Sequence, residues 1–86
     1  MKLVPHKYFE KRFKRLPKHI QEKALATMRL FTARPFDATL RNHALSGQQQ
    51  GLRSVNVTGD YRIIYDPINQ NTAILVDIGT HSQLYG

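Results

Sequence analysis

The chain of 86 residues contains no cysteine. That absence excludes a disulfide framework, a thiolate zinc site and a cysteine nucleophile. No stretch approaches the run of about 20 apolar residues that a membrane-spanning helix needs, and the N-terminal segment lacks the apolar run of a signal peptide. Repeats and low-complexity segments are also missing. The sequence therefore predicts one domain, residues 1–86, located in the cytoplasm and not bound to a membrane.

Acidic residues are scarce and unevenly placed. The chain has 13 Lys and Arg against 6 Asp and Glu, a formal net charge of +7 at pH 7. Residues 1–41 carry a net charge of +8, whereas residues 42–86 carry −1. A basic half of this kind suits a polyanion such as nucleic acid, or an acidic protein partner. Solvated helix faces would give the same charge, so the pattern favours a polyanion without identifying it.

Helical periodicity dominates the first half of the chain. Apolar residues at helical spacing predict one helix over residues 6–16 and a second over residues 18–33. Pro17 and Pro35 end these helices, because proline has no N–H and disfavours a helical residue before it. The two helices form a predicted hairpin, whose apolar face must pack on another element.

The second half alternates in the manner of β-strands. Strands are expected over residues 52–57, 61–65 and 72–78, with a short strand at 40–45 and an edge strand at 2–4. Turns and a Ser-Gly-Gln-rich loop separate them. The predicted fold class is α+β, with two N-terminal helices packed on one face of a mostly antiparallel sheet of about four strands, in β-α-α-β-β-β order.

The turn Thr58-Gly59-Asp60 sets the register of one hairpin. If the turn has three residues, Val57 pairs with Tyr61 and Val55 with Ile63, and most apolar side chains share a face. A two-residue turn would mix the two faces. The longer turn predicts a largely polar, solvent-facing row on the other face. This row consists of Ser54, Asn56 and Arg62, with Ile64 at its far end and Asp60 at its rim.

Four histidines occur, and they are not equivalent. His6 and His19 lie among Lys and Arg near predicted helix starts, and they are expected to be surface residues. His43 lies near a strand end just before a glycine-containing loop, and His81 follows the last strand. Active groups are usually carried by strand ends and loops on a rigid scaffold. His43 and His81 are therefore the candidates for chemistry.

Phosphodiester cleavage without a metal needs a base, an acid and cations that offset the charge of the transition state. Histidine suits the acid and base roles, since its unperturbed pKa is about 6.5. Arg53 and Arg62 suit the phosphate, because a guanidinium binds it through two parallel hydrogen bonds. Tyr61 and Tyr85 suit stacking on bases. On spacing alone, the scattered polar set comprises His43, Asp60, Arg62, His81 and Tyr85.

Competing motifs are weak. The sequence has no H-x-x-H or H-E-x-x-H spacing for a metal, no glycine-rich phosphate loop and no G-x-S-x-G nucleophile motif. No metal and no cofactor are therefore expected.

Two segments resemble those of a known family. The run from Arg53 to Tyr65 resembles the hairpin of RelE/ParE-superfamily toxins, and Ile78-Gly79-Thr80-His81-Ser82-Gln83-Leu84-Tyr85 resembles the C-terminal signature of their YafQ-type branch. The helical start and Leu40-Arg41-Asn42-His43 are similar in kind, so the resemblance covers nearly the whole chain. Its most specific part is Gly-Thr-His followed by an aromatic residue four positions later, which strand packing does not explain.

This resemblance implies a microbial-RNase-like fold and a toxin of a type II toxin–antitoxin system. It implies ribosome-dependent cleavage of mRNA in the ribosomal A site, leaving a 2′,3′-cyclic phosphate and inhibiting translation. It also implies a cognate antitoxin as partner. The basic helices suit an acidic or partly disordered segment of that antitoxin that folds on binding.

The family's functional positions carry over residue by residue. His43, Asp60 and His81 match the branch's functional histidine and acidic positions. Tyr85 matches its C-terminal aromatic residue, which contacts the substrate. Two further matches concern substrate binding. They are Tyr61, which stands where the branch has an aromatic residue, and Arg62, which matches the arginine used on the phosphate.

One position departs from the pattern. Asn56 stands where the type member of the branch has a further histidine, and asparagine does not exchange a proton at neutral pH. The resulting hypothesis makes His81 the general acid and His43 or Asp60 the base. Two alternatives stay open: a ParE-like toxin that inhibits DNA gyrase without cutting RNA, and a catalytically weakened member that binds RNA or a partner. The joint presence of His43 and His81 favours the nuclease.

Overall fold

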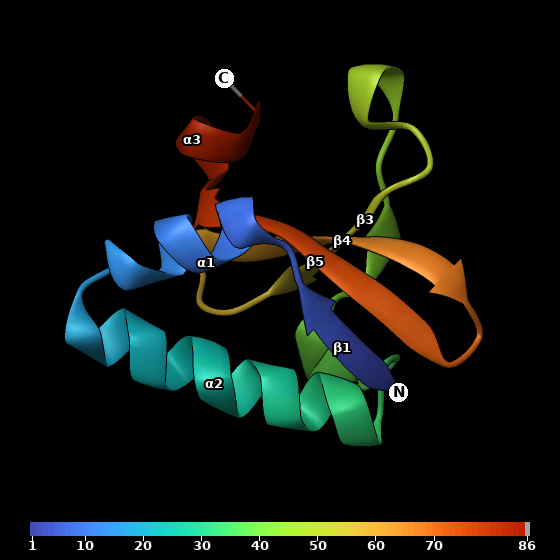
Figure 1. The fold of residues 1–86 in the computed structure, drawn as a ribbon, viewed down its shortest axis with the longest axis horizontal. Coiled ribbons are helices and arrows are strands. Elements are labelled where there is room, and N and C mark those ends of the chain that lie inside the picture. The colour runs from blue at the N-terminus through green and yellow to red at the C-terminus, as the bar shows by residue number, and fades with distance from the viewer. Residues whose placement is uncertain (86) are drawn as a thin grey trace.

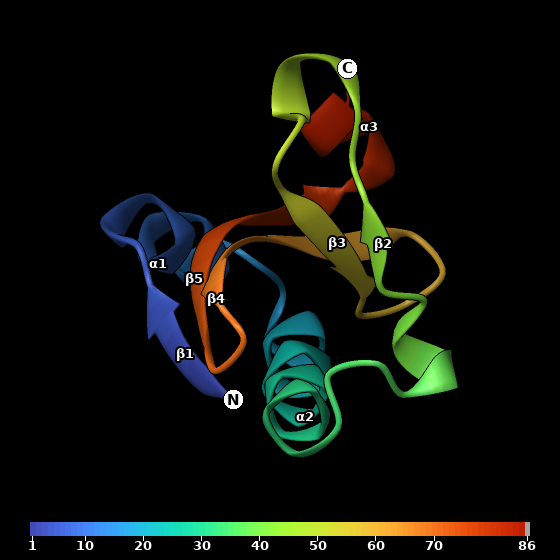
Figure 2. The ribbon, with the colours of Figure 1, turned by 90° about the vertical axis from the view of Figure 1, so that its right-hand side faces the viewer.

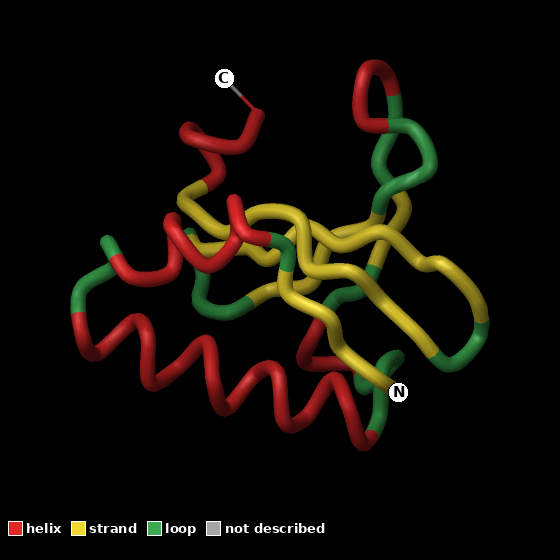
Figure 3. Tube along the Cα trace, in the orientation of Figure 1, coloured by secondary structure: helices red, strands yellow, loops and turns green. Residues whose placement is uncertain are grey.

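A computed structural model describes residues 1–85 of the chain. The main helices and strands follow the predicted order, and a short helix that was not predicted follows the last strand (Figures 1 and 3). In chain order the elements are β1 (Lys2–Pro5), α1 (Lys7–Lys14), α2 (Lys18–Ala33), the 3-10 helix η1 (Ala38–Leu40), β2 (His43–Ala44), the 3-10 helix η2 (Gly47–Gln49), β3 (Arg53–Asn56), β4 (Tyr61–Asn69), β5 (Thr72–Thr80) and α3 (His81–Tyr85).

Specific capping residues set the ends of the helices α1 and α2. α2 has the predicted bounds, with Pro17 at its N-cap. α1 is shorter than predicted. The His6 side chain stands outside the helix as its N-cap and accepts a hydrogen bond from the Tyr8 N–H, and Arg15 is the C-cap. His6 is extended and caps the helix without adopting its conformation, whereas Arg15 keeps helical dihedral angles after the last helical residue, so periodicity alone extends the helix too far.

The sheet has five strands in the order β1-β5-β4-β3-β2, not about four. β1 pairs in parallel with β5 at one edge, and all other pairs are antiparallel. β4 and β5 extend beyond the predicted strands to Asn69 and Thr80. β2 is shorter than predicted, because η1 precedes it and Arg41 adopts a left-handed conformation with φ 47°.

The predicted hairpin register is confirmed. Val55 pairs with Ile63 and Asn56 with Arg62. The Val57 N–H donates to the Tyr61 carbonyl at 2.9 Å, which closes the three-residue turn.

The two faces of the sheet are covered differently. α2 lies along one face, called the α2 face below, whereas α3 stands on the opposite side, called the α3 face (Figures 1 and 2). The core lies on the α2 face, where the rings of Phe31 and Tyr65 are 4.7 Å apart between centroids. No helix among residues 1–85 is both long and apolar enough to cross a bilayer.

One prediction about the α3 face is wrong. The row beginning at Ser54 and Ile64 was expected to face solvent, but these residues are 0% and 1% exposed. The added C-terminal helix explains part of this burial, since its Tyr85 hydroxyl lies 3.2 Å from Ser54 Oγ and donates a hydrogen bond to it. Only the half of this row nearer the turn, Asn56 and Arg62, is therefore partly exposed to solvent.

Candidate active site

Strand pairing brings polar residues from three strands, β2, β3 and β4, to the α3 face. His43 of β2 pairs with Ser54 of β3. Asn56, two residues further along β3, pairs with Arg62 of β4. Residues paired in register point to the same face of a sheet, and so do residues two apart in a strand. Arg62 in turn pairs with Gly79 of β5. The predicted residues His43, Asn56 and Arg62 therefore share one face, opposite the core.

The short helix α3 is fixed by a reciprocal cap at its start. The Gln83 N–H donates to Thr80 Oγ1 at 3.2 Å, and the Thr80 N–H donates to Gln83 Oε1 at 2.9 Å. This Thr-x-x-Gln pattern is a capping box, which satisfies two backbone donors that the helix would leave unpaired. His81 is consequently held as the first residue of α3, directly after the sheet.

The far end of α3 returns to the sheet. The His81 and Tyr85 rings meet edge-on with their centroids 4.7 Å apart. The Tyr85 hydroxyl reaches Ser54, the strand neighbour of His43. Side-chain contacts thus connect His81 and Tyr85 of α3 to Ser54 of β3, and strand pairing places His43 of β2 beside Ser54.

The turn that carries Asp60 is tied to the start of α3. The Asp60 carbonyl accepts a hydrogen bond from the His81 N–H at 3.0 Å. Thr58 Oγ1 accepts from the N–H groups of Asp60 and Tyr61, at 3.2 and 3.1 Å. Arg62 Nη1 donates to three carbonyls of the same turn, at 3.0 to 3.3 Å. The structure therefore joins the backbones of Asp60 and His81, and several hydrogen bonds cross-link the turn.

The side chain of His43 is exposed, and a backbone carbonyl contacts its ring and orients it. Its Nδ1 lies 2.8 Å from the carbonyl oxygen of Arg41, the residue with positive φ. The next residue, Asn42, points the other way: its Nδ2 donates to the Pro35 carbonyl at 2.9 Å and lies 2.7 Å from the Tyr65 hydroxyl. Asn42 thereby anchors the segment to the core while His43 projects from it.

Two predicted RNA-binding residues do not share the sheet face of Asn56 and Arg62. Arg53 pairs with Tyr65 on the α2 face, where its Nε donates to Asn42 Oδ1 at 2.9 Å and its guanidinium lies 5.5 Å from the Phe36 ring. Tyr61 is half-buried and lines a pocket with Arg12. Strand alternation accounts for both, since odd-numbered residues of this hairpin face away from Asn56 and Arg62.

Ser54, Gly79 and Thr80 belong to the predicted polar row or to the C-terminal motif, but three of their contacts were not predicted: Tyr85 with Ser54, the cap between Thr80 and Gln83, and the close approach of Arg12 to Gly79. A Cβ at Gly79 would lie 2.6 Å from Arg12 Nη2 and 2.7 Å from Gln83 Oε1. Only glycine leaves room there for both side chains. The Thr-x-x-Gln spacing was the available signal for the capped helix. Nothing in the sequence pattern indicated the approach of Arg12, which lies 66 or more positions away along the chain.

Two carboxyl groups have clearly shifted pKa values. Burial raises the pKa of Asp77, although the Ile78 N–H and the Arg12 guanidinium oppose that rise. Hydrogen bonds from Thr39 lower the pKa of Asp37, with a smaller contribution from Arg34. Both groups lie outside the cluster of His43, Asp60, His81 and Tyr85.

An open cleft of about 520 Å³ separates α3 from the loop around η2. Ser46, Gln48 and Gln49 line one side, and Leu84 and Tyr85 line the other. Figure 2 shows both segments rising from the same side of the sheet. Residues 1–85 contain no group of three or more His, Asp or Glu side chains placed to hold a metal ion.

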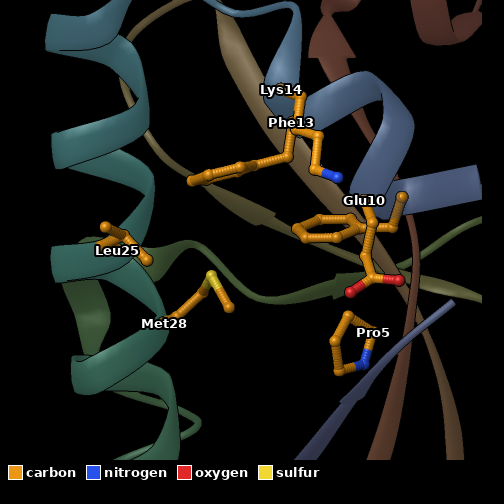
Figure 4. A pocket seen from close by; sticks show the side chains of 7 residues that line it. Pro5, Glu10, Phe13, Lys14, Leu25 and Met28 are labelled. Carbon is orange, nitrogen blue, oxygen red and sulfur yellow. The ribbon is translucent and has the colours of Figure 1, made fainter. Parts of the chain in front are cut away.

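A second hollow of about 190 Å³ lies between α1 and α2, away from the candidate site. Its lining is almost wholly apolar, with Lys14 and Glu10 beside the apolar side chains (Figure 4). The residues that line it are Pro5, Phe9, Glu10, Phe13, Lys14, Leu25 and Met28.

Known proteins share this architecture. The E. coli BL21(DE3) YafQ crystal structure has a TM-score of 0.82 at 24% identity, covering 98% of this chain and 97% of that one. The E. coli DinJ–YafQ toxin–antitoxin complex matches with a TM-score of 0.79 at 25% identity, covering 98% and 96%. The Staphylococcus aureus YoeB–YefM complex matches with a TM-score of 0.73 at 12% identity, covering 94% and 97%. No curated protein sequence matched the chain.

The fold is thus that of the toxins related to YafQ, RelE, YoeB and ParE. The family model described as "Bacterial toxin of type II toxin-antitoxin system, YafQ" matches residues 1–86. The chain belongs to the YafQ family of type II toxin–antitoxin toxins.

Proposed function

We propose that this toxin is an mRNA endoribonuclease that acts in the cytoplasm on translating ribosomes and so inhibits translation. The observation that carries the proposal is the placement of His81 and His43 on the face of the sheet that the core does not use: His81 contacts Tyr85, Tyr85 contacts Ser54, and Ser54 is the strand partner of His43. Two histidines on one open, polar face supply the acid and the base that RNA cleavage without a metal requires.

The proposed reaction is an internal displacement at phosphorus. A base takes the proton of the ribose 2′-hydroxyl, the 2′-oxygen attacks phosphorus, and the bond from phosphorus to the 5′-oxygen breaks. An acid then protonates the departing 5′-oxygen. The products are a 2′,3′-cyclic phosphate and a free 5′-hydroxyl, with no change of oxidation state.

The surroundings of His43 favour it as the base. A carbonyl oxygen only accepts hydrogen bonds, so the contact with Arg41 places the ring proton on Nδ1. In the neutral ring this leaves the lone pair of Nε2 free to take a proton. His81 then serves as the acid, and Asp60 beside it is the alternative base.

Three further residues suit the substrate. The Nε and Nη2 groups of Arg62 make no hydrogen bond within residues 1–85, while Nη1 holds the turn. They are free to bind the phosphate and offset its developing charge. Asn56 beside Arg62 offers an amide that orients without exchanging protons. Tyr85, at the wall of the open cleft, is placed to stack on a base.

We also propose a cognate antitoxin as the partner, because complexes with DinJ and YefM are known for the similar toxins YafQ and YoeB. The apolar hollow between α1 and α2 lies within the half of the chain whose net charge is +8. An acidic, amphipathic segment matches both features, since its apolar face would fill the hollow and its carboxylates would meet the surrounding Lys and Arg.

The test of the proposed activity is cleavage mapping in a purified translation system. Purified toxin is expected to cut an mRNA only while it is being translated and to leave 2′,3′-cyclic phosphate ends. A supercoiling assay with DNA gyrase runs in parallel. Inhibition of gyrase with intact mRNA would assign the chain to the ParE-like alternative, and inactivity in both assays would favour a binding module.

A further inference from the structure

A third hollow adjoins the candidate site on the other side of α3 from the open cleft. It has a volume of about 200 Å³ and is lined by Arg12, Arg15, Tyr61 and Gln83, with Ile78 and the Leu16–Pro17 corner behind them. Gln83 of α3 lines this pocket, whereas Leu84 and Tyr85 line the open cleft. Tyr61 pairs with Thr80, the residue before His81. The pocket therefore begins next to the proposed catalytic histidine.

The guanidinium of Arg12 is held by several contacts, but one of its nitrogen atoms lacks a hydrogen-bond partner. Its Nε donates to the Ile78 carbonyl at 3.3 Å and lies 3.4 Å from Asp77 Oδ1, and its Nη1 lies 3.4 Å from the Tyr8 hydroxyl. Its Nη2 is buried and has no hydrogen-bond partner within residues 1–85. A buried donor without a partner costs about 1–3 kcal/mol, and more when the group is charged, so a small side-chain shift that let an anion in the pocket reach Nη2 would remove this cost.

The other residues that line the pocket indicate which kind of anionic ligand fits it. Arg15 is exposed and adds a second guanidinium, while Tyr61 offers an aromatic ring at the same opening. Two guanidinium groups suit a phosphate, and a tyrosine ring suits a base or ribose beside it. Small-molecule sites usually enclose about 300–1,000 Å³, so a pocket of about 200 Å³ is better matched by one phosphate than by a cofactor.

We propose that this pocket, the Arg12–Arg15 pocket, binds a backbone phosphate of the substrate RNA outside the scissile linkage. The inference rests on the proposed nuclease function, which it deepens. The strand would run from the open cleft at Tyr85, over His81, to Tyr61 and Arg12. The pocket thus fixes the register of the strand on the enzyme, whereas the scissile phosphate stays with Arg62.

The test is a binding experiment with a non-cleavable strand. A 2′-O-methyl RNA hexanucleotide is titrated into the wild type, into Arg15→Gln, and into Arg29→Gln as the matched control on the exposed surface of α2. Arg15→Gln is expected to weaken binding about tenfold and to reduce the slope of log affinity against log salt by about 0.7, the value for one phosphate contact on a single strand. Arg29→Gln is expected to change neither.

A chemical double-mutant cycle locates the contact. Each phosphate of the hexanucleotide is replaced in turn by a neutral methylphosphonate, and each analogue is bound to wild type and to Arg15→Gln. One position is expected to show non-additive losses, because the two changes remove the same interaction. Arg12→Lys keeps the positive charge but loses the two parallel N–H donors of the guanidinium. It is expected to couple to the same phosphate position.

The outcomes separate this inference from the nuclease proposal. Coupling at one phosphate without any cleavage on ribosomes would retain the pocket and overturn the nuclease. Cleavage on ribosomes with no coupling at any phosphate, in both Arg variants, would retain the nuclease and overturn the pocket. If the Arg variants lose binding to the ribosome but bind the hexanucleotide as the wild type does, the pocket contacts ribosomal RNA and not the substrate strand. That result would also overturn the inference.

Discussion

The two faces of the central sheet differ in what covers them. On the α2 face, Val55, Ile63 and Leu75 are 0 to 1% exposed and pack with the helices into the core. On the α3 face, one five-residue helix stands beside an open cleft, and Asn56 and Arg62 remain partly exposed. Because burial on one face stabilises the fold, the other is free to carry polar and titratable groups.

The same strands build both faces. Within β3 and β4 a core residue and a site residue alternate, as in Val55 and Asn56, or Arg62 and Ile63. A change in the core of the α2 face should therefore act mainly on stability, whereas changes around α3 should cost less stability and act on activity. Four substitutions test this division, in order of decreasing effect on stability.

The largest loss of stability is expected for Phe31→Ala. Phe31 is 1% exposed and packs on Tyr65, so its truncation leaves a cavity worth about 3–5 kcal/mol. Urea denaturation measures the free energy of unfolding. Phe36→Ala is the matched control, because Phe36 is 69% exposed, and it should cost no more than about 1 kcal/mol. Equal losses in the two variants would show that the core is not where the structure puts it.

This α2 face could be predicted from the sequence in most respects. Periods of 3.6 and 2 residues gave the helices and strands, and the three-residue turn gave the register of Val55 and Ile63. Burial patterns of this kind are local and repeat along the chain. The bounds of the elements were less predictable, because caps such as His6 and the left-handed Arg41 depend on single residues.

The next effect is expected for Gly79→Ala. The new methyl group would lie 2.6 Å from Arg12 Nη2 and 2.7 Å from Gln83 Oε1, so both side chains must move. Overpacking of this kind costs about 1–3 kcal/mol, and displacement of Gln83 would also loosen α3 and lower activity. Gly59→Ala is the control, since no atom lies within 4 Å of its added carbon. Wild-type stability and cleavage in Gly79→Ala would contradict the close approach.

A smaller effect is expected for Thr80→Ala, which removes the cap of α3. Loss of a capping hydroxyl costs about 1 kcal/mol, and the resulting fraying should displace both His81 and Tyr85. Hydrogen exchange of the Gln83 N–H is expected to speed up while exchange in β3 and β4 stays slow. Thr80→Ser keeps the hydroxyl and should restore both protection and activity. Failure of that rescue would mean that the cap does not position the site.

The α3 face was less predictable than the α2 face, for a physical reason. A five-residue helix has almost no periodicity to detect, and its position depends on contacts between residues far apart, such as Tyr85 with Ser54 and Gly79 with Arg12. The polar row was therefore expected to be more exposed than it is. Arg53 illustrates the same difficulty, because its chemistry suits a phosphate while its strand position commits it to the α2 face.

The most direct test of the central claim compares His81→Ala with His19→Ala, both at exposed histidines. The account predicts that His81→Ala keeps the wild-type free energy of unfolding within about 0.5 kcal/mol. Its single-turnover rate on translated mRNA should fall about 10²- to 10⁴-fold, the contribution of a general acid. His19→Ala should change neither quantity. Wild-type cleavage by folded His81→Ala would contradict the account.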